Sequence, residues 1–453
     1  MLLPFLCLYW LLRSRPKAQN LLLLFFSYSV YSLLSIGYSL ILAFFTVVIW
    51  SLTHLASKQR TDRMRIQICA ISACLCVLVL LVFKYLGMFS SQSQNILIWL
   101  GISYELPIID LLLPLGLSFY TFQAIAYVVS VMRRERDSAS LFDFANYLSF
   151  APTILAGPIC RPNQLLDLFN SSRSVSRDDV DRIILLVFSF FVKKVWLASW
   201  IGGVYVDPVF ADASSRNSLE LVLALVAYSL QIFFDFSGYT DLARAIALML
   251  GFDLPENFKL PYLARSLSEF WTRWHISLST WIRDYIYFPL GGSRKGPNVT
   301  LVNLMTAMAL SGLWHGASLK FLVWGVYHGF ILCLEKIFER RGIRLNSIIL
   351  TFFAVSLGWI FFRCETLSAS LAYLKAFLNW NYPFDLSLNH FAVMTVVILA
   401  FACWFCAPRM MPGLLALLNR TPFVWKLLIT PAVISLLLSF SPEGMPSFIY
   451  AQF

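Results

Sequence analysis

The sequence predicts an all-α protein that crosses a membrane many times. Of its 453 residues, 59% are hydrophobic and only 13% are charged, whereas soluble globular proteins carry about 25% charged residues. The apolar residues form runs of about 20, which is the length that an α-helix needs to cross a bilayer. No tandem repeat or low-complexity linker is visible. We therefore expect a polytopic membrane protein that forms a single domain over residues 1–453.

The apolar runs predict about 11–12 transmembrane helices. A further run, 142–160, contains Pro152, Gly157 and Pro158 between basic clusters, so we expect a re-entrant or half-membrane helix there. The first run is followed by the basic cluster Arg13–Lys17, which favours an uncleaved first span with its N-terminus outside. The predicted spans are 1–12, 20–35, 36–56, 66–86, 107–131, 183–204, 219–250, 298–318, 320–338, 346–362, 387–407 and 427–443.

The net charge of +11 does not indicate nucleic-acid binding, because the basic residues are spread over many clusters between apolar runs. The positive-inside rule assigns these clusters to the cytoplasm. Nine cysteines, an odd number and mostly in apolar runs, predict no disulfide framework. The CxxC pair Cys403 and Cys406 lacks the two further ligands of a zinc site, so no metal is expected. Membrane lipids are the expected surroundings, and no nucleic acid is an expected partner.

Residues 251–297 are too polar to span a bilayer and too aromatic for a free loop. Glu269 and Arg273 stand four residues apart and can pair on one helix face. Trp271, Trp274 and the other aromatic residues are of the kind that gathers at membrane interfaces. Composition alone therefore predicts an interfacial amphipathic helix.

Upstream, Asp235, Tyr239 and Asp241 lie deep in an apolar stretch. Intramembrane carboxylates usually face a cavity or pair with a base. The alternative is a structural ion pair between Asp241 and Arg244, three residues apart. Lys193–Lys194 interrupt another apolar run, where they either reach the interface or mark a helix break or a polar interior.

His315 lies in "SGLWHGAS" (311–318), inside an apolar run. An imidazole in hydrocarbon is costly unless it is hydrogen-bonded or used in chemistry. His315 is therefore either a buried histidine that ties helices together or a general base. An unperturbed imidazole, with a pKa of about 6.5, accepts a proton near neutral pH. Gly316 would leave the backbone open to close approach, and Trp314 would supply an apolar wall.

Other catalytic patterns are absent from the sequence. It contains no G-x-S-x-G nucleophile elbow, no H-E-x-x-H zinc site and no G-x-x-x-x-G-K-[ST] phosphate loop. A covalent serine enzyme, a metalloenzyme and an ATPase are therefore not expected. A base that acts on a substrate carried by another molecule fits the histidines, carboxylates and aromatic residues that remain.

At these residues the chain resembles the membrane-bound O-acyltransferase family, whose Trp-His-Gly motif matches "SGLWHGAS". The resemblance is to the branch that contains the alginate O-acetyltransferase membrane subunit. It runs from about residue 110 to the end and is strongest over 231–331. Lys320 and Arg244 depart from that branch, which usually has uncharged residues there. The other matching blocks are "APTILAGPICRPNQ", "FVKKVWLASWIGGVYVDPVF", "DFSGYTDLARAIALMLGFDLPENFKLPY", "EFWTRWHISLSTWIRDYIYFPLGGSRKG" and "PSFIYAQF".

The resemblance implies a ring of tilted helices around a central tunnel, with His315 as the catalytic base and His275, from the Arg-Trp-His block, as a second catalytic position. It implies a multi-pass O-acetyltransferase of the bacterial inner membrane, with acetyl-CoA as the donor and no bound cofactor. An extracytoplasmic esterase-fold (SGNH-type) partner would then acetylate an exported polysaccharide such as alginate, cellulose or peptidoglycan. Further residues expected along the tunnel are Trp314, Asp235, Tyr239, Asp241, Arg273, Trp274 and Asp284.

Two other functions remain open. D-alanyl transfer from a carrier protein to a cell-wall polymer belongs to a branch with the same histidine motifs. A lipid-linked sugar transporter would share the aromatic residues and buried charges, but it would not need His315. The longest expected outside loop, about 363–386, is shorter than the roughly 50 residues of a small domain, so polymer binding is assigned to the partner. We expect His328 to be a packing histidine and assign no function to His54 or His390.

Overall fold

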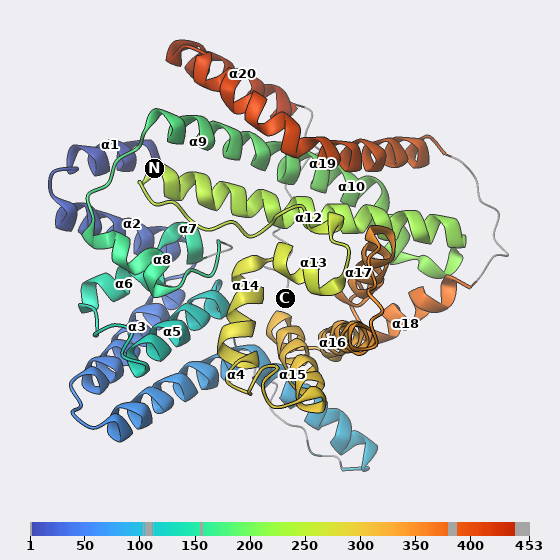
Figure 1. Ribbon diagram of the computed structural model, residues 1–453, viewed down its shortest axis with the longest axis horizontal. Helices are drawn as coiled ribbons and strands as arrows, with labels where there is room; N and C mark the ends of the chain where they lie inside the picture. Colours follow the sequence, from blue (N-terminus) through green and yellow to red (C-terminus); the bar gives the residue numbers. More distant parts are fainter. Residues whose placement is uncertain are drawn as a thin grey trace. The chain divides into compact units, whose positions relative to one another are not determined.

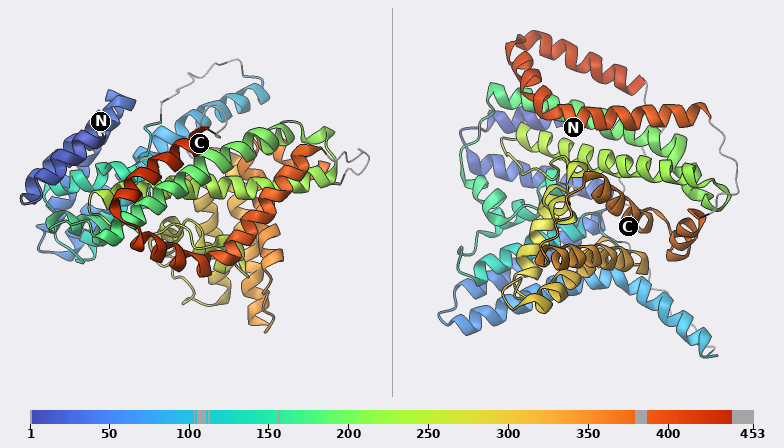
Figure 2. Two further views of the ribbon diagram at one scale, coloured as in Figure 1. Left: turned by 90° about the horizontal axis from the view of Figure 1, so that it is seen from above. Right: turned by 45° about the vertical axis from the view of Figure 1, so that its right-hand side comes forward.

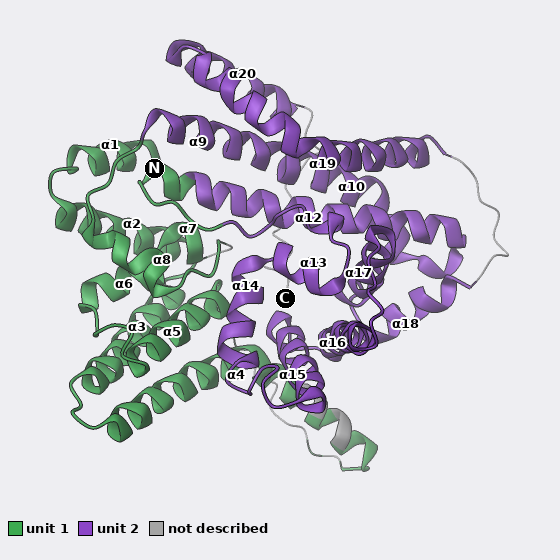
Figure 3. Ribbon diagram, viewed as in Figure 1, with its two compact units in different colours: residues 1–175, 246–255 green, residues 176–245, 256–453 purple. Residues whose placement is uncertain are grey.

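The computed structural model describes residues 2–102, 104, 111, 113–154, 157–378 and 387–439. Throughout these residues it consists of α-helices, short 3₁₀ and π-helical segments and loops, with no β-strand. Figure 3 shows two compact units, residues 1–175 with 246–255 and residues 176–245 with 256–453. The predicted all-α class is confirmed, whereas the single domain over 1–453 remains a prediction.

Unit 1 contains the N-terminal helices, and the longest of them, α4, packs against both α3 and α5 (Figure 1). The last residues of α12 also belong to this unit. Its helices are α1 (Leu2–Leu11), α2 (Pro16–Leu34), α3 (Ile36–Ser57), α4 (Asp62–Trp99), α5 (Leu117–Met132), α6 (Leu141–Ser149), α7 (Ala151–Ile154), α8 (Pro162–Leu165) and the 3₁₀ turn η1 (Leu166–Asn170).

Unit 2 contains the candidate site. It begins with one continuous helical stretch that changes twice from α to π geometry: α9 (Arg177–Phe190), η2 (Phe191–Ala198), α10 (Ser199–Ile201), η3 (Gly202–Val206) and α11 (Asp207–Ala211). Its remaining elements are η4 (Ala213–Ser215), α12 (Ser218–Met249), η5 (Pro261–Leu263), α13 (Leu267–Arg273), α14 (Ile276–Ile282), η6 (Arg283–Tyr287), α15 (Pro297–His315), α16 (Leu319–Arg340), α17 (Ile348–Arg363), α18 (Leu367–Ala376), α19 (Leu388–Arg420) and α20 (Phe423–Ser439).

Six helices are long and apolar enough to cross a bilayer: α3, α4 up to Ser90, the stretch Arg177–Ala211, α12, α16 and α19. Four shorter apolar helices are α1, α5, α17 and α20. The chain is thus a multi-pass membrane protein, as predicted. The predicted boundary between 298–318 and 320–338 is correct, since α15 ends at His315 and α16 begins at Leu319. Parts of the predicted spans 107–131 and 427–443, part of the loop 363–386 and all of "PSFIYAQF" lie outside the described residues.

The run 142–160 is not a spanning helix. It contains the short helices α6 and α7, which are separated at Phe150, where the backbone is non-helical (φ −53°, ψ 107°). Pro152 follows two residues later. In one continuous helix over this run, Pro152 would lie in the interior, where it has no N–H to donate to the carbonyl four residues earlier. The run is therefore interrupted at Phe150, and the re-entrant or half-membrane helix remains a prediction.

Residues 251–297 do not form the single amphipathic helix that composition predicts. Helix α13 ends at Arg273, and α14 begins at Ile276. Between them His275 has a left-handed backbone (φ 41°), which an α-helix cannot contain. Trp274 is buried rather than interfacial, and its ring packs 5.0 Å from that of Trp359. Burial of Trp274 on the core of unit 2 thus outweighs continuation of the helix.

Helices α15 and α16 lie side by side in all views (Figures 1 and 2), and they approach closely at two glycines. A Cβ on Gly312 would lie 2.2 Å from the Phe321 carbonyl oxygen, and a Cβ on Gly325 would lie 2.3 Å from that of Met308. Both obstacles are backbone atoms, which cannot rotate away. Small residues that let helix backbones approach are typical of membrane helix pairs.

We expect Gly325→Ala to lower stability by about 1–3 kcal/mol, because the new methyl group must push the two backbones apart. The measurement is the thermal unfolding midpoint of the detergent-purified protein. Gly413→Ala is the matched control, since Gly413 is also inside a helix but has open space around its Cβ position. An unfolding midpoint for Gly325→Ala equal to that of Gly413→Ala would contradict the close packing.

Candidate active site

His315 is the last residue of α15, and aromatic rings surround it. It is buried, with 4% of its surface exposed. The ring centres of Trp314, Trp324 and Phe362 lie 5.1, 5.0 and 5.2 Å from that of its imidazole, and all three pairs are T-shaped. Three helices therefore hold one imidazole: α15 carries it, and α16 and α17 supply two of the rings.

Gly316 does not leave space for a substrate, contrary to the expectation from sequence. Its backbone is extended (φ −171°), and an added Cβ would lie 2.2 Å from the ring of Phe321. The missing side chain thus makes room for a ring of α16. The following residues, Ala317 and Ser318, are half-buried.

His275 occupies the turn between α13 and α14 and is fully buried. Asn257, also buried, holds this turn from two sides: its carbonyl accepts from the Ile276 amide at 3.0 Å, and its Oδ1 accepts from the Ser277 amide at 3.1 Å. Burial lowers the pKa of His275 to about 3. The imidazole is therefore neutral at pH 7 and is a poor proton acceptor there.

The structure brings His275 and His315 into one aromatic cluster. The indole of Trp314 lies between them, 6.2 Å from the ring of His275 and 5.1 Å from that of His315. Phe236 of α12 contacts His275 from another side, with ring centres 4.7 Å apart. The two histidines that the sequence singled out, 40 residues apart, thus share one neighbour.

A seam of charges runs between α12 and the π-helical segment η2. Lys194 pairs with Asp235, and both side chains are buried. Lys193 pairs with Asp241 at 2.8 Å, and the Ser189 hydroxyl donates to the same carboxylate at 2.7 Å. The two lysines therefore neither reach for the interface nor break the helix. They provide the counter-charges of the two intramembrane carboxylates.

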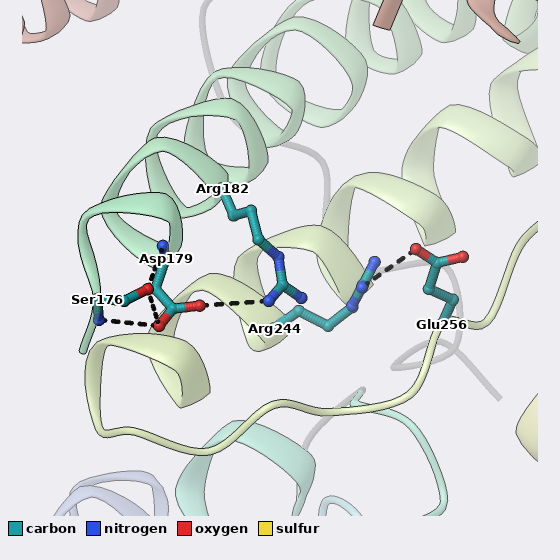
Figure 4. A network of polar contacts seen from close by, with 5 residues as sticks. All are labelled: Ser176, Asp179, Arg182, Arg244 and Glu256. Carbon is teal, nitrogen blue, oxygen red and sulfur yellow. Dashed lines mark hydrogen bonds and ion pairs between the residues drawn. The ribbon is translucent and has the colours of Figure 1, made fainter. Parts of the chain in front are cut away.

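The alternative pairing of Asp241 with Arg244 is wrong. Arg244 instead reaches Glu256, 3.2 Å away, in the segment after α12 (Figure 4). In the same view Arg182 of α9 pairs with Asp179 at 3.3 Å, and Asp179 forms a capping box with Ser176. Asp241 pairs with a lysine 48 residues away, because η2 packs alongside α12 there.

Tyr239 also belongs to the charge seam, since the Lys194 ammonium lies 5.4 Å from its ring centre. Arg273 and Asp284 belong to local ion pairs. Arg273 pairs with Glu269 at 2.5 Å, as the i,i+4 spacing predicts, and Asp284 pairs with Arg283 at 2.8 Å. These two pairs are partly exposed.

Lys320, where the family branch has an uncharged residue, stabilises the end of α17. Its buried ammonium donates to the carbonyl oxygens of Cys364, at 2.5 Å, and of Phe362, at 3.4 Å. A cation at a helix C-terminus offsets the negative end of the helix dipole. The adjacent Arg363 pairs with Asp207 at 2.6 Å. The turn that presents Phe362 to His315 is thus fixed by two cations.

The remaining histidines have surroundings that suit structural roles. His328 is buried among Trp271, Trp324 and Trp359, as a packing histidine would be. His390 caps the start of α19 through Ser387, and His54 stacks on Trp50. Among the described residues, no group of three His, Cys, Asp or Glu side chains is arranged to hold a metal ion.

A family model for the membrane-bound O-acyltransferases matches residues 20–372. The chain belongs to this family. The match covers most of the chain and includes His275 and His315. It begins at residue 20, well before residue 110, where the resemblance of the sequence motifs begins. As a member of the membrane-bound O-acyltransferase family the protein is an acyltransferase, and it acts on an acyl donor in a membrane.

Three relatives show which members of the family are similar. The chain is 37% identical over 385 residues to Probable alginate O-acetylase AlgI of Pseudomonas aeruginosa, covering 83% of this chain and 72% of the relative. It is 31% identical over 334 residues to Peptidoglycan O-acetyltransferase of Helicobacter pylori, covering 66% and 62%. It is 29% identical over 245 residues to Teichoic acid D-alanyltransferase of Streptococcus thermophilus, covering 51% and 59%.

Sequence reasoning missed Asn257, Phe236, Trp324 and Phe362 as parts of the site. Asn257 lies inside the matching block that ends in "LPENFKLPY", so its membership of that block was a signal. Phe236 lies inside the same block, directly after Asp235. Trp324 and Phe362 carried no signal, because the chain has 40 Phe and 14 Trp residues. Only packing shows which of these rings face a histidine.

We expect Asp235→Asn to lower stability by about 3–5 kcal/mol, because it removes the carboxylate charge from a buried ion pair. Thermal unfolding of the purified protein measures the loss. Glu339→Gln is the control: its pair with Lys336 is exposed, and such pairs contribute about 0–1 kcal/mol.

The double variant Lys194→Met with Asp235→Leu is expected to recover much of the lost stability, since an apolar pair needs no charge compensation. If the Asp235→Asn protein were as stable as the Glu339→Gln protein, Lys194 and Asp235 would not form a stabilising buried ion pair.

We expect His275→Asn to make the protein less sensitive to acid. In the wild type the folded pKa of about 3 lies below the unfolded value of about 6.5. The unfolded chain therefore gains a proton as the pH falls below about 6.5, and stability declines by up to about 1.4 kcal/mol per pH unit towards pH 3. Asparagine tolerates the left-handed backbone of position 275 and does not titrate.

The measurement is the unfolding midpoint between pH 7 and pH 4.5 for both proteins. A smaller decline in His275→Asn supports a neutral buried imidazole. An equal decline would mean that His275 is protonated in the folded protein at these pH values.

Proposed function

We propose that this protein is a membrane O-acetyltransferase that supplies acetyl groups for the O-acetylation of an exported polysaccharide. The position of His315 carries the proposal: it ends α15, is enclosed by rings of three helices and lies in the family's Trp-His-Gly motif. The similarity to AlgI and to the peptidoglycan enzyme, each over about two thirds of this chain or more, supports acetyl transfer to a glycan. The bacterial inner membrane is the location that these relatives support.

In the proposed reaction His315 acts as the general base. A hydroxyl oxygen attacks the thioester carbonyl carbon of acetyl-CoA, and the imidazole accepts the hydroxyl proton. The carbon–sulfur bond then breaks, and the imidazole returns the proton to the leaving thiolate, so that the products are an ester and a thiol. Such proton transfer typically contributes about 10²–10⁴ in rate. The buried, neutral His275 serves as a second polar group that orients donor or acceptor from across Trp314.

Among the other candidates, the geometry favours positioning roles. Asp235, Asp241 and Tyr239 form the charge seam with the two lysines, and Trp274 packs in the core of unit 2. Arg273 and Asp284, in partly exposed pairs, are proposed to contact substrate at the edge of the site. We propose an extracytoplasmic esterase-fold (SGNH-type) partner as the protein that transfers the acetyl group to the polymer. The central tunnel and this partner rest on the family resemblance.

The alternative is D-alanyl transfer from a carrier protein. It is supported by the teichoic acid relative, but that identity is lower and covers only 51% of this chain. The donor distinguishes the two: acetyl-CoA for O-acetylation, an aminoacyl carrier protein for D-alanylation.

We expect His315→Ala and His315→Gln to reduce ester formation by at least about 100-fold, because each removes the proton acceptor. The measurement is acetate released from the exported polymer by mild alkali, in cells that also contain the partner. His54→Gln is the control, because His54 only stacks on Trp50 and should keep wild-type ester levels.

Each variant must insert and purify like the wild type for the comparison to hold. Wild-type ester levels in folded His315→Ala would contradict the general-base role. Purified wild type supplied with labelled acetyl-CoA should release free thiol, whereas transfer only from an aminoacyl carrier protein would favour the alternative.

A further inference from the structure

A pocket at the end of α1 in unit 1 has the chemistry of an anion-binding site, and the proposed acyl transfer does not use it. Its volume is about 800 Å³. Two arginines, Arg13 and Arg173, contribute to its lining together with apolar residues. The lining residues are Cys7, Trp10, Leu11, Arg13, Arg173, Ser174 and Val175.

Arg173 is a buried cation whose partners are all neutral. It is 8% exposed. One terminal nitrogen donates to the Tyr9 hydroxyl at 2.6 Å, and the other donates to Asn20 Oδ1 and, at 3.2 Å, to the Phe169 carbonyl. The guanidinium carbon lies 4.5 Å from the ring centre of Phe252. Its Nε has no hydrogen-bond partner within the described part of the chain.

Part of this charge has a structural use. The Tyr9 hydroxyl accepts from Arg173 and donates to the Leu250 carbonyl at 2.9 Å, just after the end of α12. A cation there offsets the negative end of the helix dipole, but a helix end supplies only about half an elementary charge. A buried guanidinium without a counter-ion costs several kcal/mol. The remaining charge therefore favours an anion.

Arg13 provides the second cation. It is exposed at the rim of the pocket. Across the described residues, neither Arg13 nor Arg173 has a carboxylate within ion-pair distance. Guanidinium groups present their N–H donors in a planar fork that matches phosphate oxygens. Two arginines in one pocket lining, together with Ser174, suit a phosphate better than a single carboxylate.

The apolar part of the pocket indicates an amphiphilic ligand. Leu11 is 78% exposed and Leu8 on the same helix is 47% exposed. The indole of Trp10 is held in place by a bond from its Nε1 to the Met249 carbonyl at 3.1 Å. We propose that this pocket binds the phosphate of an anionic phospholipid between Arg13 and Arg173, with an acyl chain along the exposed leucines of α1.

The proposal does not depend on acyl transfer, because binding is measured without substrate. The purified full-length protein in detergent is titrated with phosphatidylglycerol and, separately, phosphatidylcholine, and native mass spectrometry counts the bound lipids. We expect one tight site for phosphatidylglycerol with an affinity on the order of tenfold above that for phosphatidylcholine, since both lipids offer a phosphate to the arginines but the choline cation of phosphatidylcholine offsets its charge.

Arg13→Gln is the main variant, because Arg13 is exposed and the fold does not need it. It should weaken phosphatidylglycerol binding on the order of tenfold and weaken phosphatidylcholine binding less, so that the preference for the anionic lipid falls. Arg60→Gln, which also removes an exposed arginine of unit 1, should bind like the wild type. Arg173→Lys keeps the charge but loses the fork, and it should also bind more weakly.

Two results would overturn the proposal. Equal affinity of Arg13→Gln and Arg60→Gln for phosphatidylglycerol would exclude the pocket as the site. Displacement of phosphatidylglycerol by inorganic phosphate or by coenzyme A at low millimolar concentration would show that the pocket takes a soluble phosphate instead of a lipid.

Discussion

The close contact between α15 and α16 determines the surroundings of His315. Because Gly312 and Gly325 lack side chains, the two backbones approach closely, and Phe321 fills the space beside Gly316. This contact places Trp324 5.0 Å from the imidazole. Helix α17 then adds Phe362, and two cations fix its C-terminal turn. A loop could not hold three rings around one imidazole so closely, since loops carry few buried contacts.

A second constraint is the compensation of buried charge. Asp235 and Asp241 lie on the face of α12 that meets η2, and each meets one lysine of that segment. Phe236, next to Asp235 in sequence, contacts His275. The same stretch of α12 therefore supports the charge seam and the histidine cluster. Carboxylates that are neutralised in place are suited to holding helices in register, and less suited to exchanging protons with a substrate.

The sequence predicted the features that depend on local pattern. The long apolar runs predicted helices, and the boundary between the runs 298–318 and 320–338 predicted the gap between α15 and α16. The i,i+4 spacing predicted the pair of Glu269 with Arg273. The Trp-His-Gly and Arg-Trp-His blocks identified the two histidines that share Trp314. No composition rule could have placed both against one indole, because they are 40 residues apart and on different helices.

What the sequence could not predict depends on contacts between distant segments. The partner of Asp241 is 48 residues away, and the nearer Arg244 reaches forward to Glu256. The helix break at His275 depends on burying Trp274 against Trp359, which outweighs local helix propensity. In both cases local sequence spacing predicted one arrangement, and contacts between distant segments produced a different one.

The two histidines lie in different surroundings. His275 is enclosed on all sides, and burial lowers its pKa to about 3, so at neutral pH its ring donates or accepts a hydrogen bond but does not take up a proton. His315 is followed by half-buried residues where α15 ends and the chain turns. In the proposed reaction the base must reach the substrate, and His315, at the last residue of α15, is the candidate for that role. Trp314 contacts both rings, 6.2 Å from that of His275 and 5.1 Å from that of His315, so a change in this indole would alter the surroundings of both histidines.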